Sequence, residues 1–191
     1  MTYCQVAATL AADSTDPNKH YHDHVYGFAV DADNELFARL VLEINQAGLS
    51  WTTILKKWQG FYQAYAEFDI ATVAAFGDAD VARLLADAGI IRNRLKIQAA
   101  VYNAQQILVL QQEYGSFKAW LDHHHPLSLE AWVKLFKQHF KFVGGEIVNE
   151  FLMSTGYLAG AHAADCPVLT SVLASQPAFV NTQSKDKPCL E

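Results

Sequence analysis

Cysteine is scarce in this sequence, which contains only Cys4, Cys166 and Cys189 among 191 residues. Three cysteines form no disulfide framework, and their odd number fits a reducing compartment in which thiols stay free, catalytic or bound to metal. Basic residues are also few, because 14 Lys and Arg stand against 20 Asp and Glu and leave a formal net charge of −6. That balance argues against indiscriminate nucleic-acid binding, although a local basic patch is compatible with it.

Long apolar runs are missing as well. No stretch is long and apolar enough to span a bilayer, and the first residues lack the charged start and apolar stretch of a signal peptide. We therefore expect a soluble, cytoplasmic protein that has no membrane partner.

What the sequence does contain is apolar residues at helical spacing. Hydrophobic residues make up 51% of the chain and charged residues 18%, so a sizeable core is available. The i, i+3, i+4 pattern recurs from Leu36 to Gly156 and no segment alternates with period two for long, which predicts an all-α fold. We expect one domain over residues 1–175, made of two helical lobes around a cleft, followed by a mobile tail at 176–191.

The segment 42–51 (LEINQAGLSW) suggests a pocket. Glu43 lies near the end of an amphipathic helix, and Gly48 follows at a position where glycine commonly ends a helix. Leu49 and Trp51 come directly after it, so a carboxylate and two large apolar side chains gather around one turn. The alternative is a solvated Glu43 and a tryptophan that packs in the core.

Aromatic residues elsewhere suit the same pocket. Tyr21 and Tyr26 lie in a histidine-rich segment and, with Trp51, offer three aromatic faces around Glu43. Such a pocket suits a flat cationic ring, because aromatic faces attract positive charge and a carboxylate accepts hydrogen bonds from N–H groups. Three core aromatics that merely share a neighbourhood are the alternative.

Potential metal ligands stand near the two ends of the chain. His162 and Cys166 are spaced one helical turn apart, and Cys4 and His22 can supply the other half of a tetrahedral Cys2His2 site. Zinc suits these donors, and a site with four protein ligands is closed and therefore structural. Unconnected histidines and cysteines are the alternative.

A cluster of cations follows the helix that ends at Gly89. Arg92, Arg94 and Lys96 lie at the start of the next helix, where free N–H groups and the positive end of the helix dipole attract an anion. Cations there add a sequence-independent attraction to phosphate. The segment 84–97 thus has the pattern of a helix-hairpin-helix, which grips a DNA backbone without reading bases; an ordinary turn with solvated cations is the alternative.

Five motifs occur in order along the chain: YHD at 21–23, LE-x-x-QAGLSW at 42–51, DAGIIRNRLKIQA at 87–99, FKFVG at 140–144 and H-x-x-x-C at 162–166. Together they resemble the 3-methyladenine DNA glycosylase I family, for which QAGLSW followed by GIIRNR is highly specific. The resemblance covers most of the chain, from Cys4 to about Cys166. It implies an all-α helix-hairpin-helix glycosylase fold with a structural zinc site that ties the N-terminal arm to the C-terminal segment.

The resemblance also implies roles for single residues. Glu43 corresponds to the carboxylate that recognises the base, with Tyr21 and Trp51 packed against it, and Leu49 to a residue that wedges into the duplex. Tyr26 replaces a pocket tryptophan. The implied zinc ligands are Cys4, His22, His162 and Cys166. The implied phosphate-binding residues are Gly89, Arg92, Arg94 and Lys96.

The implied activity is that of a monofunctional DNA glycosylase. It flips 3-methyladenine out of alkylated double-stranded DNA and hydrolyses the N-glycosidic bond. Because N3-methylation makes adenine cationic and a good leaving group, Glu43 acts as a recognition and electrostatic residue first, and little general-acid power is needed. We expect a monomer that acts in a bacterial cytoplasm, at the nucleoid.

Departures from the family pattern keep other functions open. The family usually has C-x-W and E-W-G near its N-terminus, whereas this chain has Val6 and Tyr26, so two pocket tryptophans are missing or replaced. One alternative is a catalytically weak or altered-specificity relative that serves as a DNA-lesion binding protein. Another is a zinc hydrolase of small molecules, against which a site with four protein ligands argues.

Overall fold

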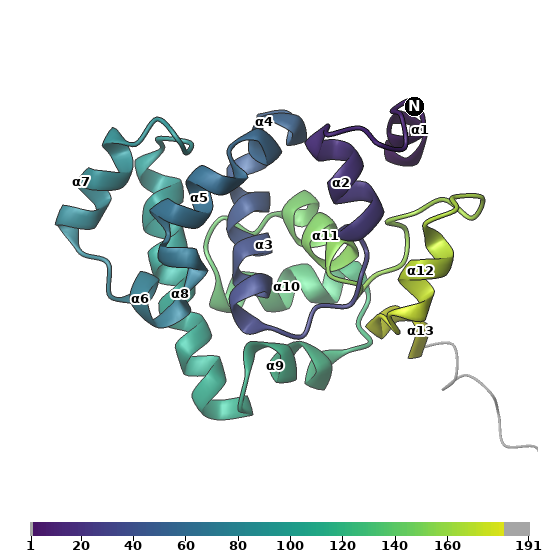
Figure 1. Cartoon of the computed structure of the whole chain (residues 1–191). Helices are drawn as coiled ribbons and strands as arrows, with labels where there is room; N and C mark the ends of the chain where they lie inside the picture. Colours follow the sequence, from purple (N-terminus) through teal and green to yellow (C-terminus); the bar gives the residue numbers. More distant parts are fainter. Residues whose placement is uncertain (1, 182–191) are drawn as a thin grey trace, which may run out of the picture. The chain divides into compact units, whose positions relative to one another are not determined.

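The computed structural model describes residues 2–181, and all regular secondary structure among them is helical (Figure 1). The all-α prediction is therefore confirmed for the described part of the chain. The chain divides into two compact units: unit 1 is built from residues up to Val30 and from Asn149 onward, and unit 2 from Asp31–Val148. No helix in the described range is long and apolar enough to cross a membrane.

Unit 2 contains most of the helices. In chain order they are α3 (Asp33–Gln46), α4 (Trp51–Lys56), α5 (Trp58–Ala64), the 3-10 helix η1 (Ala66–Phe68), α6 (Ile70–Ala74), α7 (Asp78–Ala86), α8 (Arg94–Tyr114), α9 (Phe117–His124) and α10 (Leu129–His139). The 21-residue α8 packs along α6 and also contacts α7 and α9 (Figure 1). Trp120 and Trp132 are fully buried among other aromatic rings, so the apolar face of α9 and α10 forms part of the core.

Two polar residues at the start of α3 cap other helices. The N-cap of α3 itself is Ala32, which makes no side-chain capping bond. The Asp33 carboxylate instead accepts hydrogen bonds from the first N–H groups of α9, at 2.7 and 2.9 Å. The Asn34 side-chain oxygen accepts from the first N–H of α6, at 3.3 Å. These bonds satisfy N–H groups that a helix leaves without partners.

Unit 1 contains shorter helices joined by ordered turns. They are α1 (Tyr3–Ala8), α2 (Pro17–His24), the part of α11 (Gly145–Ser154) from Asn149 on, α12 (Leu169–Ala174) and α13 (Ala178–Asn181). Gly27 ends the segment after α2, where its φ is +84° and its N–H donates to the Ser154 carbonyl oxygen at 3.0 Å. A Cβ there would lie 2.8 Å from the Cβ of Ala161, so this turn accepts only glycine without rearrangement.

The segment expected to form a tail begins with ordered structure. Residues 178–181 form α13, and the N–H of Phe179 donates to the Gly156 carbonyl oxygen at 3.0 Å. Pro177 packs so closely on Gly156 that a Cβ added there would lie 2.7 Å away. The rest of the expected tail, residues 182–191, lies outside the described residues.

Candidate functional site

Four residues with metal-binding side chains converge in unit 1. Cys4 lies in α1 and His22 in α2, whereas His162 and Cys166 lie in the loop between α11 and α12. One ligand atom from each residue lies within 4.8 Å of the other three. Cys166 Sγ is 3.5 Å from Nδ1 of His162 and 3.7 Å from Nε2 of His22, and Cys4 Sγ is 3.9 Å from His162 Nδ1. The sequence predicts this group as a set of ligands, and its residues could hold a metal ion.

In each of the two histidines, a hydrogen bond occupies one ring nitrogen and leaves the nitrogen that faces Cys166 available to a metal. Nδ1 of His22 lies 2.7 Å from a carboxylate oxygen of Asp23, and Nε2 of His162 lies 2.7 Å from the carbonyl oxygen of Tyr26. Both oxygens only accept, so each of these ring nitrogens carries the hydrogen and donates it. In a neutral imidazole the opposite nitrogen therefore keeps its lone pair, and in both histidines this nitrogen faces the sulfur of Cys166. Metal-binding histidines usually have this arrangement of supporting acceptors.

Surroundings shift the pKa values of several groups here, and burial raises the pKa of the Cys4 thiol above its ordinary value. Burial lowers the pKa of His162 below its ordinary value of 6.5, although the hydrogen bond to Tyr26 acts in the opposite direction. The neutral imidazole, which binds metal ions, is thus the form present at neutral pH. Burial by itself would raise the pKa of Asp23, but hydrogen bonds and charge from His22 and Lys19 lower it overall. Asp23 is therefore a carboxylate that orients His22.

Glu43 lies near the end of α3 and is buried. Only 4% of its surface is exposed, so the alternative of a solvated Glu43 is wrong. Its helix is apolar along most of its length, with Leu36, Leu40 and Ile44 almost fully buried. Because burial of a carboxylate is unfavourable unless polar partners compensate, an ionisable group at this position is unusual for a residue that serves packing alone.

The turn after α3 is held by hydrogen bonds of its own. The N–H of Leu49 donates to the Gln46 carbonyl oxygen at 2.7 Å, and the Gln46 side-chain amide donates to the Leu49 carbonyl oxygen at 2.9 Å. Gly48 has a φ of +84°, which favours glycine. Ser50 then caps α4 by accepting from the N–H of Thr53 at 3.2 Å. Leu49, 39% exposed, is thus an apolar side chain on a well-defined turn.

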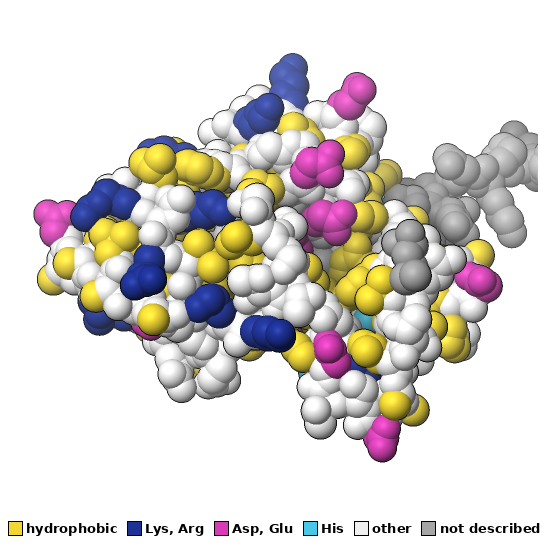
Figure 2. Space-filling model, turned by 90° about the horizontal axis from the view of Figure 1, so that it is seen from above, with side chains coloured by type: hydrophobic (Ala, Val, Ile, Leu, Met, Phe, Trp, Pro, Cys, Tyr) yellow, Lys and Arg dark blue, Asp and Glu magenta, His cyan; other side chains and the backbone are white. Residues whose placement is uncertain are grey.

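The segment predicted to form a hairpin is the turn between α7 and α8, here called the α7–α8 hairpin. Asn93 caps α8 by accepting from the N–H groups of Leu95 and Lys96, at 3.0 and 3.2 Å. Arg92 and Arg94 are exposed. In Figure 2 the Lys and Arg side chains gather, with apolar side chains between them, on the side of the view where α5 and α7 lie.

Lys96 differs from these two arginines. Its ammonium donates to the carbonyl oxygens of Asn45 and Ala47, at 3.0 and 2.9 Å, at the end of α3. Partial burial lowers its pKa below the ordinary value of 10.5. The sequence predicts phosphate contacts for all three cations, whereas the structure gives Lys96 carbonyl partners within the protein.

A close backbone approach holds the hairpin, and the sequence pattern offers no signal for it. A Cβ added to Gly60, in α5, would lie 2.4 Å from the carbonyl oxygen of Gly89. The ammonium of Lys57 donates to the neighbouring Ala88 carbonyl oxygen at 2.6 Å. Gly89, predicted as a helix end, therefore lies in a turn that α5 supports directly.

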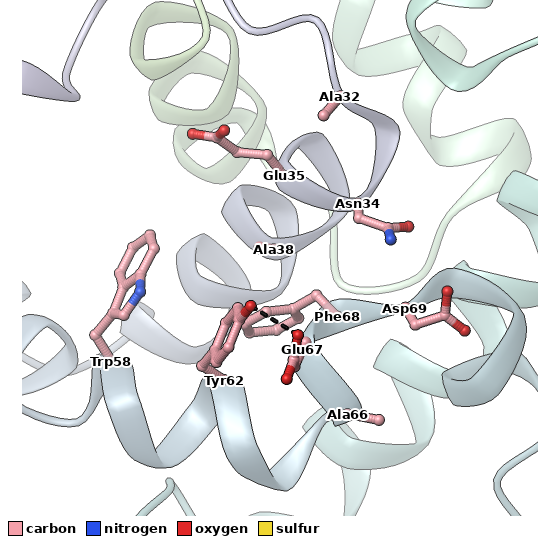
Figure 3. Close-up of a pocket in the computed structure, with 10 residues that line it drawn as sticks. All are labelled: Ala32, Asn34, Glu35, Ala38, Trp58, Tyr62, Ala66, Glu67, Phe68 and Asp69. Carbon is pink, nitrogen blue, oxygen red and sulfur yellow. Dashed lines mark hydrogen bonds between the residues drawn. The ribbon is translucent and has the colours of Figure 1, made fainter.

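Unit 2 also has an open cavity of about 600 Å³ beside the start of α3 (Figure 3). None of the predicted site residues lines it. Its carboxylates have partners within the protein, since Glu67 accepts from Tyr62 at 2.9 Å, Asp69 caps α6, and Glu35 pairs with Arg39. The cavity is therefore an open recess between α3, α5 and η1 whose carboxylates are engaged within the protein.

Comparisons with known proteins agree with this architecture. A family model described as methyladenine glycosylase matches residues 11–134. The DNA-3-methyladenine glycosylase 1 of Escherichia coli K12 is 36% identical over 165 residues, which cover 76% of this chain and 88% of that protein. The DNA-3-methyladenine glycosylase of Haemophilus influenzae is 31% identical over 170 residues, or 79% of this chain and 91% of that protein.

A solved structure of the Staphylococcus aureus 3-methyladenine DNA glycosylase I superposes with a TM-score of 0.75 at 31% identity, covering 87% of this chain and 97% of the other. That structure addresses the structural basis of 3-methyladenine recognition by the Staphylococcus aureus protein. The helical fold and these matches define the class of protein as an all-α base glycosylase. The chain belongs to the methyladenine glycosylase family.

Proposed function

We propose that this protein is a base-excision repair enzyme that removes 3-methyladenine from alkylated double-stranded DNA by hydrolysing the N-glycosidic bond. Membership of the methyladenine glycosylase family, over more than half of the chain, carries the proposal. The buried carboxylate of Glu43 supports it, because a site for a cationic base requires a negative group sheltered from water.

In the proposed mechanism the damaged nucleotide leaves the base stack before the reaction, as in other enzymes that act on a base in duplex DNA. Glu43 accepts hydrogen bonds from N–H groups of the base and favours its positive charge. A cationic purine is already a good leaving group, so the protein's main tasks are to select that base and to stabilise the positive charge that develops on the sugar as water attacks.

Aromatic side chains are proposed to select the flat base. Trp51, half-buried at the start of α4, offers a ring face that attracts cationic rings. Tyr21 and Tyr26 take the base-packing role that the family resemblance implies. Leu49 is proposed to fill the space in the duplex from which the base has left, a role for which an exposed apolar side chain on a fixed turn is suited.

The DNA backbone is proposed to bind at the α7–α8 hairpin, as a helix-hairpin-helix. The exposed Arg92 and Arg94 supply charge, and the turn at Gly89 lets the backbone approach a phosphate. Contacts of this kind fix the position of the enzyme on the duplex without reading its sequence.

The four-residue Cys/His group is proposed to hold a structural Zn²⁺. Zinc bonds of about 2.3 Å to sulfur and about 2.0 Å to nitrogen, arranged tetrahedrally, separate the two kinds of donor by about 3.5 Å. The sulfur–nitrogen distances of 3.5, 3.7 and 3.9 Å are close to that value. With four protein ligands the ion would have no open position for a substrate, so Cys4 and His22 would fix α1 and α2 to the loop that carries His162 and Cys166.

The remaining features of the proposal follow from the family. We propose that one glycosylase domain spans residues 1–175, that the protein acts as a monomer, and that it works in a bacterial cytoplasm at the nucleoid. Double-stranded DNA containing alkylated bases is its proposed partner.

Chromatography of bases released from methylated duplex DNA tests the proposed activity, with metal analysis of the same preparation. We expect free 3-methyladenine and about one zinc ion per chain, as a single closed site requires. A protein that binds methylated duplex tightly but releases no base would instead support the alternative, a lesion-binding relative.

A further inference from the structure

One side chain ties the turn that carries Leu49 to the start of α8. The ammonium of Lys96 donates to the carbonyl oxygens of Asn45 and Ala47, at 3.0 and 2.9 Å. The last carbonyl groups of a helix lack partners within it, and a cation near them also interacts favourably with the negative end of the helix dipole. Lys96 thus has the position and charge of a residue that completes the end of α3.

The same bonds limit what else Lys96 can do. An ammonium has three N–H donors, and two of them are directed to protein carbonyls. Lys96 is also partly buried, whereas its neighbours Arg92 and Arg94 are exposed. The two arginines therefore have free charge to offer a phosphate, and Lys96 has its charge directed into the protein.

We propose that Lys96 is a positioning residue for base excision and not one of the phosphate-binding cations. Asn45 lies two residues after Glu43, and Ala47 lies two residues before Leu49. By binding both carbonyl oxygens, Lys96 holds Glu43 and Leu49 at a set distance from the hairpin. Glu43 is the residue proposed to recognise the base, and Leu49 is the residue proposed to enter the duplex.

This inference rests on the proposed function. A duplex gripped at Arg92 and Arg94 presents the extruded base at one place, so the spacing from the hairpin to Glu43 must be exact. A misplacement of about 1 Å at a catalytic site is enough to slow a reaction by about a hundredfold. Loss of Lys96 is therefore expected to slow the reaction of bound DNA and to leave its binding intact.

The test compares Lys96→Met with Arg94→Met, because both changes remove one positive charge, keep an apolar stem and lie in the first turn of α8. Two quantities are measured: the affinity for undamaged duplex as a function of salt, and the rate of 3-methyladenine release with enzyme in saturating excess. For Lys96→Met we expect an unchanged salt slope and a release rate lowered by about ten- to a hundredfold. For Arg94→Met we expect the slope of log K against log salt to fall by about one.

Two results would overturn the inference. One is a salt slope for Lys96→Met that falls by as much as that of Arg94→Met, which would make Lys96 a phosphate contact. The other is a release rate for Lys96→Met equal to that of the unchanged protein. Lys96→Gln, whose amide still donates to one carbonyl, provides a second neutral variant if Lys96→Met folds poorly.

A conservative substitution distinguishes a positioning role of the Lys96 charge from a packing role of its side chain. Lys96→Arg keeps a cation that can donate to both carbonyls, so we expect it to recover most of the release rate, whereas Lys96→Met keeps the stem alone. A rate for Lys96→Arg as low as that of Lys96→Met would contradict the role of the charge. If the unchanged protein released no 3-methyladenine, the proposed function would fail, while the salt slopes, measured on undamaged duplex, would still show whether Lys96 binds phosphate.

Discussion

Gly60 of α5 and Gly89 of the α7–α8 hairpin touch through their backbones. A Cβ on Gly60 would lie 2.4 Å from the carbonyl oxygen of Gly89 and 2.8 Å from its carbonyl carbon, closer than real Cβ atoms come to such groups. The absence of a side chain therefore allows α5 to support the turn proposed to bind phosphate.

Gly60→Ala is expected to destabilise the fold by about 1–3 kcal/mol, because the new methyl group meets rigid backbone that must shift. Urea unfolding measures this change. Gly144→Ala is the matched control, since a Cβ added there meets nothing within 4 Å and a change within about 0.5 kcal/mol is expected. Equal stability of the two variants would show that the Gly60 contact is not restrictive.

Glu43→Gln is expected to lower the rate of 3-methyladenine release by about ten- to a hundredfold. The change keeps the size of the side chain but removes its charge, and hydrogen bonds to a charged group contribute about 1.5–3 kcal/mol. Release of 3-methyladenine from methylated duplex is measured together with the melting curve. Glu130→Gln, at an exposed position of α10, is the control. An unaltered release rate would remove Glu43 from the proposed site.

Cys166→Ala is expected to lose the bound metal and to lower the melting temperature, because a structural ion contributes its binding free energy to folding. Metal analysis and thermal unfolding measure the two effects. Ser171→Ala, at an exposed position of α12 in the same unit, is the control. A parent protein that contains no metal and melts at the same temperature as Cys166→Ala would reject the zinc site.

Asp23→Ala is expected to weaken metal binding by about ten- to a hundredfold without removing a ligand. Asp23 accepts the hydrogen of His22 Nδ1 and thereby keeps Nε2 available to the metal. Competition with a chromogenic chelator measures the affinity. Asp13→Ala removes an exposed carboxylate from the same unit and controls for the change in net charge; identical chelator curves for the two variants would contradict the supporting role of Asp23.

Local patterns in the sequence predict many of the elements. The all-α class predicted from helical spacing is observed across the described residues, and Gly48 follows the end of α3 as its position in the sequence indicates. These features are predictable because helix formation and burial depend on residues three or four positions apart, which periodicity records directly. The Cys/His group could be predicted for a different reason, because cysteines are few and the H-x-x-x-C spacing, together with the family resemblance, indicates the ligands.

Bonds between residues far apart in the chain could not be predicted in this way. Asp33 caps α9 although it stands at the start of α3, and Lys96 reaches Asn45 and Ala47 although it lies among cations that suggest phosphate. The type of a polar residue shows that it needs a partner, but not which of several partners the folded chain brings within 3 Å.

The sequence by itself thus determined the helical class, the family and the four residues able to bind a metal, because these depend on residue type and local spacing. The tertiary structure decided which ring nitrogen of His162 donates a hydrogen bond, which helix Asp33 caps, and whether the charge of Lys96 is directed to solvent or to the end of α3. Those outcomes depend on distances between segments separated by tens of residues, and packing alone sets such distances.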